Sequence, residues 1–187
     1  MKGIMFNTKY GLEQAVLRGY KTRTWRADKK PRFNCGEIAA IKQSYKQLIT
    51  DQPKEWLYEK GLLANFPIEG EIVPLAYLRS AGYNNKMFVR PDLMPYHIRI
   101  TAIKPCRLQD ITNEECLREG IDFYRQGGVI YYNCTGIYMK GHPGVLNPFR
   151  TAKDAFFMLI NKLNGWGYWN SNPYGYAYEF ELVKTNE

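Results

Sequence analysis

The sequence is poor in side chains that bind metals. It holds four cysteines and two histidines, and no two cysteines form a C-x-x-C pair. Zinc sites and disulfide frameworks use cysteines and histidines clustered at short spacings. We therefore predict neither a metal site nor a disulfide framework, and no cofactor. Spacing alone leaves open a mixed Cys/His site assembled in three dimensions.

Long hydrophobic runs are also lacking. No stretch approaches the roughly 20 apolar residues that span a bilayer, and residues 1–6 lack the apolar run of a signal peptide. There is no block of five or six like charges, no low-complexity segment and no internal repeat. We therefore expect a soluble cytoplasmic protein without a membrane partner.

Positive charge and aromatic side chains are plentiful instead. The formal net charge is +8, and 15 tyrosines, nine phenylalanines and four tryptophans are present. Positive charge favours an anionic partner, and aromatic rings offer faces on which bases stack. This composition is consistent with RNA, a nucleotide or a nucleoside as partner, although many proteins that bind none of these share it.

The pattern of hydrophobic residues predicts an α+β fold in one domain, residues 1–187, because 187 residues with 45% hydrophobic content suit one substantial core. Helices are expected over 7–20, 112–120 and 151–164, and strands over 22–26, 36–45, 71–78, 96–105 and 176–182. Two segments, at about 46–69 and 122–150, are expected to be loop insertions, the first with one short helix at most.

One helix start is marked by a capping box. The Thr112 hydroxyl is expected to accept from the backbone N–H of Glu115, whose carboxylate reaches back to Thr112. This helix should end at Gly120, with Glu119 in the last turn, where the helix dipole disfavours a carboxylate.

The stretch from Gly19 to Arg26 holds two threonines, a lysine and two arginines beside a tryptophan. The octet Gly19-x-Lys21-x-x-Thr24-x-Arg26 resembles the G-x-K-x-x-[E/T]-x-R signature of the ASCH domain, a family of the PUA-like superfamily. Two further landmarks resemble this family in the same order: the segment 108–112 that leads into the helix ending at Glu119, and the segment 172–181. The resemblance implies a small PUA-like β-barrel with helices on its rim.

One branch of the ASCH family consists of small amidohydrolases that remove the acetyl group from N4-acetylcytidine. The resemblance implies Lys21 as general base, Thr24 as nucleophile and Glu119 as the third member. A neutral lysine requires a pKa lowered from about 10.4 to about 7 or 8, by burial or by nearby cations such as Arg23 and Arg26. Because positions 21 and 24 point to opposite faces of a regular strand, Lys21 must lie in a bend after the helix, or a bulge must separate the two.

A binding domain places fewer demands on the same residues. In this interpretation Arg23, Arg26, Lys42 and Tyr45 are ligand-binding residues, supplying phosphate contacts and one stacking face around a polar cleft. The strand that holds Lys42 would lie close to Arg26 if the two strands pair. Binding of RNA, a nucleotide or a modified nucleoside is our main prediction and amidohydrolase activity the alternative. A domain with neither function is the third possibility.

Overall fold

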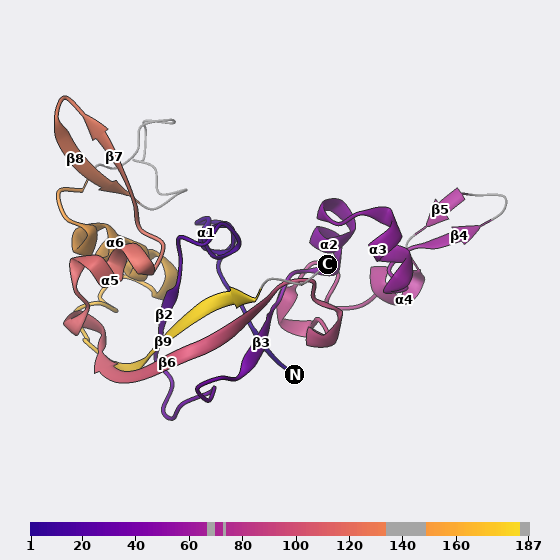
Figure 1. The fold of residues 1–187 in the computed structure, drawn as a ribbon, viewed down its shortest axis with the longest axis horizontal. Coiled ribbons are helices and arrows are strands. Elements are labelled where there is room, and N and C mark those ends of the chain that lie inside the picture. Colours follow the sequence, from indigo (N-terminus) through magenta and orange to yellow (C-terminus); the bar gives the residue numbers. More distant parts are fainter. Residues whose placement is uncertain (67–69, 73, 134–148, 184–187) are drawn as a thin grey trace. The chain divides into compact units, whose positions relative to one another are not determined.

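The computed structural model describes residues 1–66, 70–72, 74–133 and 149–183 (Figure 1). The chain divides into two compact units. The first contains Met1–Phe6 and Ile38–His97, and the second contains Asn7–Glu37 and Ile98–Glu187. Each unit is described by itself.

The first unit combines a parallel strand pair with short helices. Strand β1 (Lys2–Ile4) pairs with β3 (Ile38–Ile41). The other elements are helices α2 (Tyr45–Asp51), α3 (Lys54–Glu59) and α4 (Leu75–Leu78), the hairpin of β4 (Ala64–Phe66) and β5 (Gly70–Ile72), and 3₁₀ turns η1 (Lys86–Phe88) and η2 (Pro91–Leu93). Side chains of α2, α3 and the following segments pack into one hydrophobic cluster.

Two expectations for the first unit are wrong. The segment 46–69 is not a loop with one short helix at most, because α2 and α3 occupy most of its first half. The segment 71–78 is not one strand, because the short strand β5 ends at Ile72 and α4 begins at Leu75. Pro53 does not interrupt the helices of 46–69, because it directly precedes the first residue of α3, a place where proline is well tolerated.

The second unit carries the segments that resemble the ASCH family. Its elements are α1 (Leu12–Leu17), β2 (Arg23–Arg26), β6 (His97–Arg107, of which His97 falls in the first unit), η3 (Leu108–Asp110), α5 (Asn113–Arg118), α6 (Ala152–Asn164) and β9 (Tyr174–Val183). Strand β2 is antiparallel to β9, and α5 contacts both α6 and β2 (Figure 1). These contacts place the end of α5 beside the start of β2.

Local signals fixed the ends of two of these helices. Both bonds of the predicted capping box are present at the start of α5, where Thr112 and Glu115 hydrogen-bond each other's backbone N–H. Thr151 caps α6 in the predicted place, and Gly165 follows its last residue. These expectations are confirmed because a cap depends on residues only three positions apart.

The predicted excursion at 122–150 begins as an ordered hairpin, with β7 (Asp122–Gln126) antiparallel to β8 (Val129–Asn133). The rest of this predicted insertion, residues 134–148, lies outside the described residues.

The hydrogen-bonded strand order is β1-β3 within the first unit and β6-β9-β2 within the second, and the hairpins β4-β5 and β7-β8 form separate two-stranded sheets. The α+β class is therefore confirmed. In the described part of the chain, no strand pairing closes either set of strands into a barrel. No described helix combines the length and the apolar character needed to span a membrane.

Candidate functional site

The site is built on β2, whose register with β9 decides where its side chains point. Arg23 is opposite Glu179 and Thr24 is opposite Tyr178. Because side chains alternate along a strand, Arg23 and Trp25 lie on one face of the β2-β9 pair. Thr24 lies on the other face.

Lys21 precedes this strand and lies in the bend after α1, where Gly19 has a φ of 81°. Its Nζ donates to the backbone carbonyl of Arg23 at 2.8 Å. The carbonyl of Thr22 accepts from the N–H of Phe180 in β9 at 2.9 Å. In an alternating antiparallel ladder the next carbonyl, that of Arg23, points away from β9. The Lys21 side chain therefore supplies a donor at the outer edge of β2.

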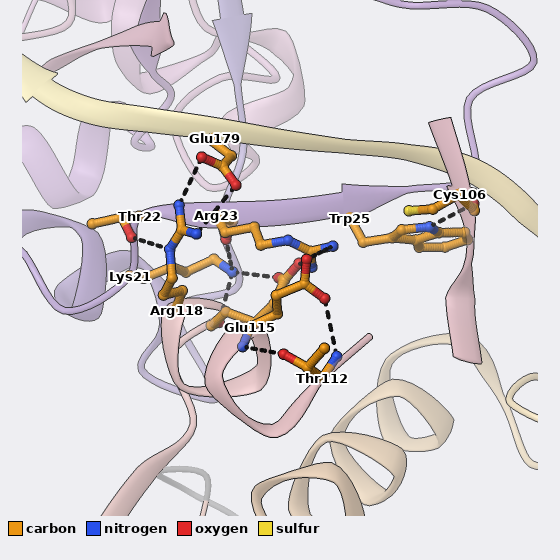
Figure 2. A network of polar contacts seen from close by, with 10 residues as sticks. Lys21, Thr22, Arg23, Trp25, Cys106, Thr112, Glu115, Arg118 and Glu179 are labelled. Carbon is orange, nitrogen blue, oxygen red and sulfur yellow. Dashed lines mark hydrogen bonds and ion pairs between the residues drawn. The ribbon is translucent and has the colours of Figure 1, made fainter. Parts of the chain in front are cut away.

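Glu119 joins Lys21 to Arg23. Figure 2 shows the side chains of these two cations close together, with Glu115 beside Arg23. One carboxylate oxygen of Glu119 accepts from Lys21 Nζ at 2.8 Å, and the other accepts from Arg23 Nη1 at 2.9 Å. Side-chain exposure is 2% for Lys21, 2% for Arg23 and 5% for Glu119. Glu115 adds a second carboxylate 3.5 Å from Arg23 Nη2. Two cations and two carboxylates thus form one mostly buried network.

The network also explains why a carboxylate is tolerated at the end of α5. Glu119 is the C-cap residue of this helix, where the backbone carbonyls lack partners. Lys21 Nζ donates to the Glu119 backbone carbonyl at 2.6 Å. Lys21 therefore does two things: it neutralises the Glu119 carboxylate, and it donates a hydrogen bond to a backbone carbonyl at the end of the helix.

The hydrogen bonds of Lys21 match its charged form. Its Nζ donates to the Arg23 carbonyl, the Glu119 carbonyl and the Glu119 carboxylate. An ammonium has three N–H donors, whereas a neutral amine has two and a lone pair. Burial lowers the pKa of Lys21 from its ordinary value, and the carboxylate of Glu119 acts in the opposite direction. The geometry favours the ammonium form.

Thr24 is buried on the face of β2 that it shares with Tyr178. The Tyr178 hydroxyl donates to the Asp28 carboxylate at 2.9 Å and accepts from the backbone N–H of Arg32, also at 2.9 Å. The loop after β2 is therefore fastened to the Tyr178 end of this face. The predicted condition that Lys21 lies outside the regular strand is met, and Lys21 Nζ donates to Arg23 and to Glu119.

Arg26 shares this face and is half-buried. Burial lowers the pKa of its guanidinium, and the positive charge of Arg32 adds to the effect, whereas Glu119 and Asp28 oppose it. Arg32 and Asp28 form an ion pair at 3.5 Å. The link of this pair to Tyr178 was not predicted, because Tyr178 lies 150 positions from Asp28 in the sequence.

Lys42 and Tyr45, the other predicted ligand residues, belong to the first unit. Strand β3, which ends just before Lys42, does not pair with β2, because β3 pairs with β1 and β2 with β9. The Tyr45 ring is buried and meets Tyr77 edge-on, and its hydroxyl accepts from the Arg90 N–H at 3.1 Å. Tyr45 is therefore a core residue of its unit and offers no exposed stacking face. Lys42 is half-buried and donates to the Met87 carbonyl.

Three further charged residues at the network were not predicted: Glu115, Arg118 and Glu179. Arg118 pairs with Glu179 at 2.9 Å and also donates to the Thr22 hydroxyl at 3.3 Å. The capping box was a usable signal for Glu115, because it fixes that residue on the first turn of α5. Among the residues that the structure describes, no group of three or more His, Cys, Asp or Glu side chains is arranged to hold a metal ion.

Cys116 lies on α5 next to the charged network, and its side chain is fully buried. Burial, with the negative charge of Glu119, raises the pKa of its thiol from 9.0 to about 12. The folded state therefore holds the proton more tightly than the unfolded state, so this contribution to stability is complete below pH 9 and is lost as the pH rises toward 12.

We predict that the unfolding free energy of the wild type falls more steeply above pH 9 than that of Cys116→Ala. The extra slope should approach about 1.4 kcal/mol per pH unit. Urea unfolding at several pH values between 8 and 11 measures it. Parallel profiles for the two proteins would contradict the assignment.

No family model, curated protein or solved structure matches the chain. The resemblance to the ASCH family therefore rests on the residues quoted from the sequence and stays a prediction.

Proposed function

We propose that this chain is an ASCH-type binding domain for RNA, a nucleotide or a modified nucleoside, and that its main sheet is part of a small PUA-like β-barrel. The observation that carries the proposal is the Lys21 ammonium, which donates to the Arg23 carbonyl and to both the carbonyl and the carboxylate of Glu119. A lysine held in this way stabilises the junction between α5 and β2. It has no lone pair with which to take a proton from a hydroxyl.

The ligand-binding role then falls on the opposite face of β2, where Arg26 lies. Its guanidinium is half-buried near that of Arg32, and both would gain from a bound anion. The chain's net charge of +8 adds long-range attraction for a polyanion. Phosphate is the group that fits this arrangement, since guanidinium groups bind it through paired hydrogen bonds.

Fluorescence anisotropy with labelled single-stranded RNA tests the proposal. Affinity should fall linearly with salt concentration on a log–log plot. Arg26→Ala should weaken binding and reduce the slope by about one, as expected for one lost phosphate contact. Arg99→Ala is the matched control, because Arg99 is half-exposed on β6 and pairs only loosely with Glu181, at 3.5 Å. Absence of binding at low salt would refute the proposal.

Amidohydrolase activity is the second candidate, favoured by one observation. Lys21 and Glu119, two of the three residues that the resemblance implies, are in contact, and burial lowers the pKa of Lys21. In this reaction the Thr24 oxygen would bond to the acetyl carbon of N4-acetylcytidine while Lys21 accepted the hydroxyl proton. The C–N bond would then break, and the cytidine amine would take up a proton. Water would release acetate from Thr24 and restore its hydroxyl.

The candidate reaction is tested by incubating the protein with N4-acetylcytidine and measuring free cytidine. If the reaction occurs, Thr24→Ala should abolish it, whereas Thr24→Ser should retain part of it because serine keeps the hydroxyl. No cytidine release by the wild type would exclude this substrate and leave the binding function as proposed.

A further inference from the structure

Three tyrosines recur at every second position of β9, at 174, 176 and 178. Alternation along the strand puts all three on one face, and the register puts Arg26 directly opposite Tyr176 on that face. Thr24, opposite Tyr178, belongs to the same face. One side of the β2-β9 pair therefore carries a row of aromatic rings next to a guanidinium.

Exposure changes along this row. Tyr174 is 56% exposed, Tyr176 is half-buried and Tyr178 is fully buried. The rings of Tyr174 and Tyr176 meet edge-on, with centroids 6.3 Å apart and planes at 75°. An edge-on neighbour supports the Tyr174 ring without covering both of its faces. The outermost ring is thus held by its neighbour and is open to solvent.

Charge is arranged along the same row. Tyr178 fixes Asp28 and the backbone of Arg32 at its buried end, and the Arg32 side chain is 52% exposed. Two guanidiniums, those of Arg26 and Arg32, therefore accompany one carboxylate, that of Asp28. The row is positive where it is half-buried and aromatic where it is exposed.

We propose that a surface along this row, formed by Tyr174, Tyr176, Arg26 and Arg32, binds a single-stranded nucleic acid. One base stacks on Tyr174, and Arg26 and Arg32 hold an adjacent phosphate. The inference rests on the proposed function and adds which surface contacts the strand. Stacking on a tyrosine accepts every base, because each base has a π-face. The row therefore recognises a single strand without strong sequence preference.

Two probes separate the base from the phosphate: a labelled oligouridine, and an abasic ribose-phosphate strand of the same length. Tyr174→Ala should weaken oligouridine binding at least about fivefold, since one stacked base is lost. Tyr174→Phe should bind like the wild type, because the ring is kept. Neither variant should change affinity for the abasic strand, whereas Arg26→Ala should weaken both probes.

Tyr20→Ala is the matched control, because Tyr20 is also highly exposed but lies outside β9, after α1. It should bind oligouridine like the wild type. If the wild type binds oligouridine and Tyr174→Ala binds equally well, the stacking surface is refuted and the binding function stands. If the wild type binds neither probe, both are refuted.

Discussion

Glu119→Gln should destabilise the protein by about 3–5 kcal/mol, the range found when one partner of a buried ion pair is removed. The Glu119 carboxylate accepts from Lys21 at 2.8 Å and from Arg23 at 2.9 Å, and all three side chains are almost completely buried. Glutamine keeps the size of the side chain but leaves two buried cations without their shared counter-charge. Urea unfolding should show a lower midpoint with an unchanged m-value.

A matched control uses the exposed pair in the same unit. Glu181 lies 3.5 Å from Arg99, and both side chains are half-exposed or more. Glu181→Gln should leave the urea midpoint nearly unchanged, because solvent screens such pairs. A shift for Glu119→Gln as small as that of Glu181→Gln would contradict the buried network.

A second substitution shows whether uncompensated charge is the cause. In the Glu119→Gln background, Lys21→Met removes one of the two buried cations while keeping a long side chain. The double variant should therefore be less destabilised than the sum of the two single variants. Simple additivity would indicate that the two side chains contribute independently.

How far the sequence predicts this site depends on the distance between the residues involved. The capping box of Thr112 and Glu115 was predicted because its partners are three positions apart. The contact of Lys21 with Glu119 joins residues 98 positions apart, so no periodicity indicates it. It was expected only because the resemblance assigned the two residues to one site. Arg23 was expected near Lys21 because the two are close in the sequence. Its ion pairs with Glu115 and Glu119 were not expected.

Tyr45 illustrates a prediction that failed for a local reason. The segment 36–45 was interpreted as one strand, but β3 ends at Ile41 and α2 begins at Tyr45. The Ser44 side chain caps this helix by accepting from the Gln47 N–H at 3.2 Å. The S-x-x-Q pattern at 44–47 is the usual signature of a helix start and was the available signal. Because Tyr45 lies on a helix and not on a strand, its ring points into the hydrophobic core of the first unit.

The other large effect is expected at Gly175. This residue lies on the face of the β2-β9 pair that carries Arg23 and Trp25. A Cβ at this position would overlap the Arg26 carbonyl oxygen and would lie 2.6 Å from Trp25 Cζ2. Gly175→Ala must therefore push β9 away from β2 or displace the Trp25 ring, whose Nε1 donates to the Cys106 carbonyl at 3.4 Å. We expect a loss of about 3 kcal/mol or more, at the upper end for overpacked sites, because backbone obstructs the new atom.

Gly19→Ala separates this overlap from the ordinary penalty of replacing glycine. Gly19 has a φ of 81° and no neighbour within 4 Å of its ideal Cβ, so alanine there meets only backbone strain of about 1–2 kcal/mol. Gly175→Ala should also weaken RNA binding, because Arg26 and Tyr176 keep their positions only while the two strands stay paired. If Gly175→Ala unfolds at the same urea concentration as the wild type, the close approach of β2 to β9 at this position is wrong. The surface proposed for the nucleic acid would then lose its framework, since the register that sets Arg26 beside Tyr176 is the register that leaves no room for a side chain at 175.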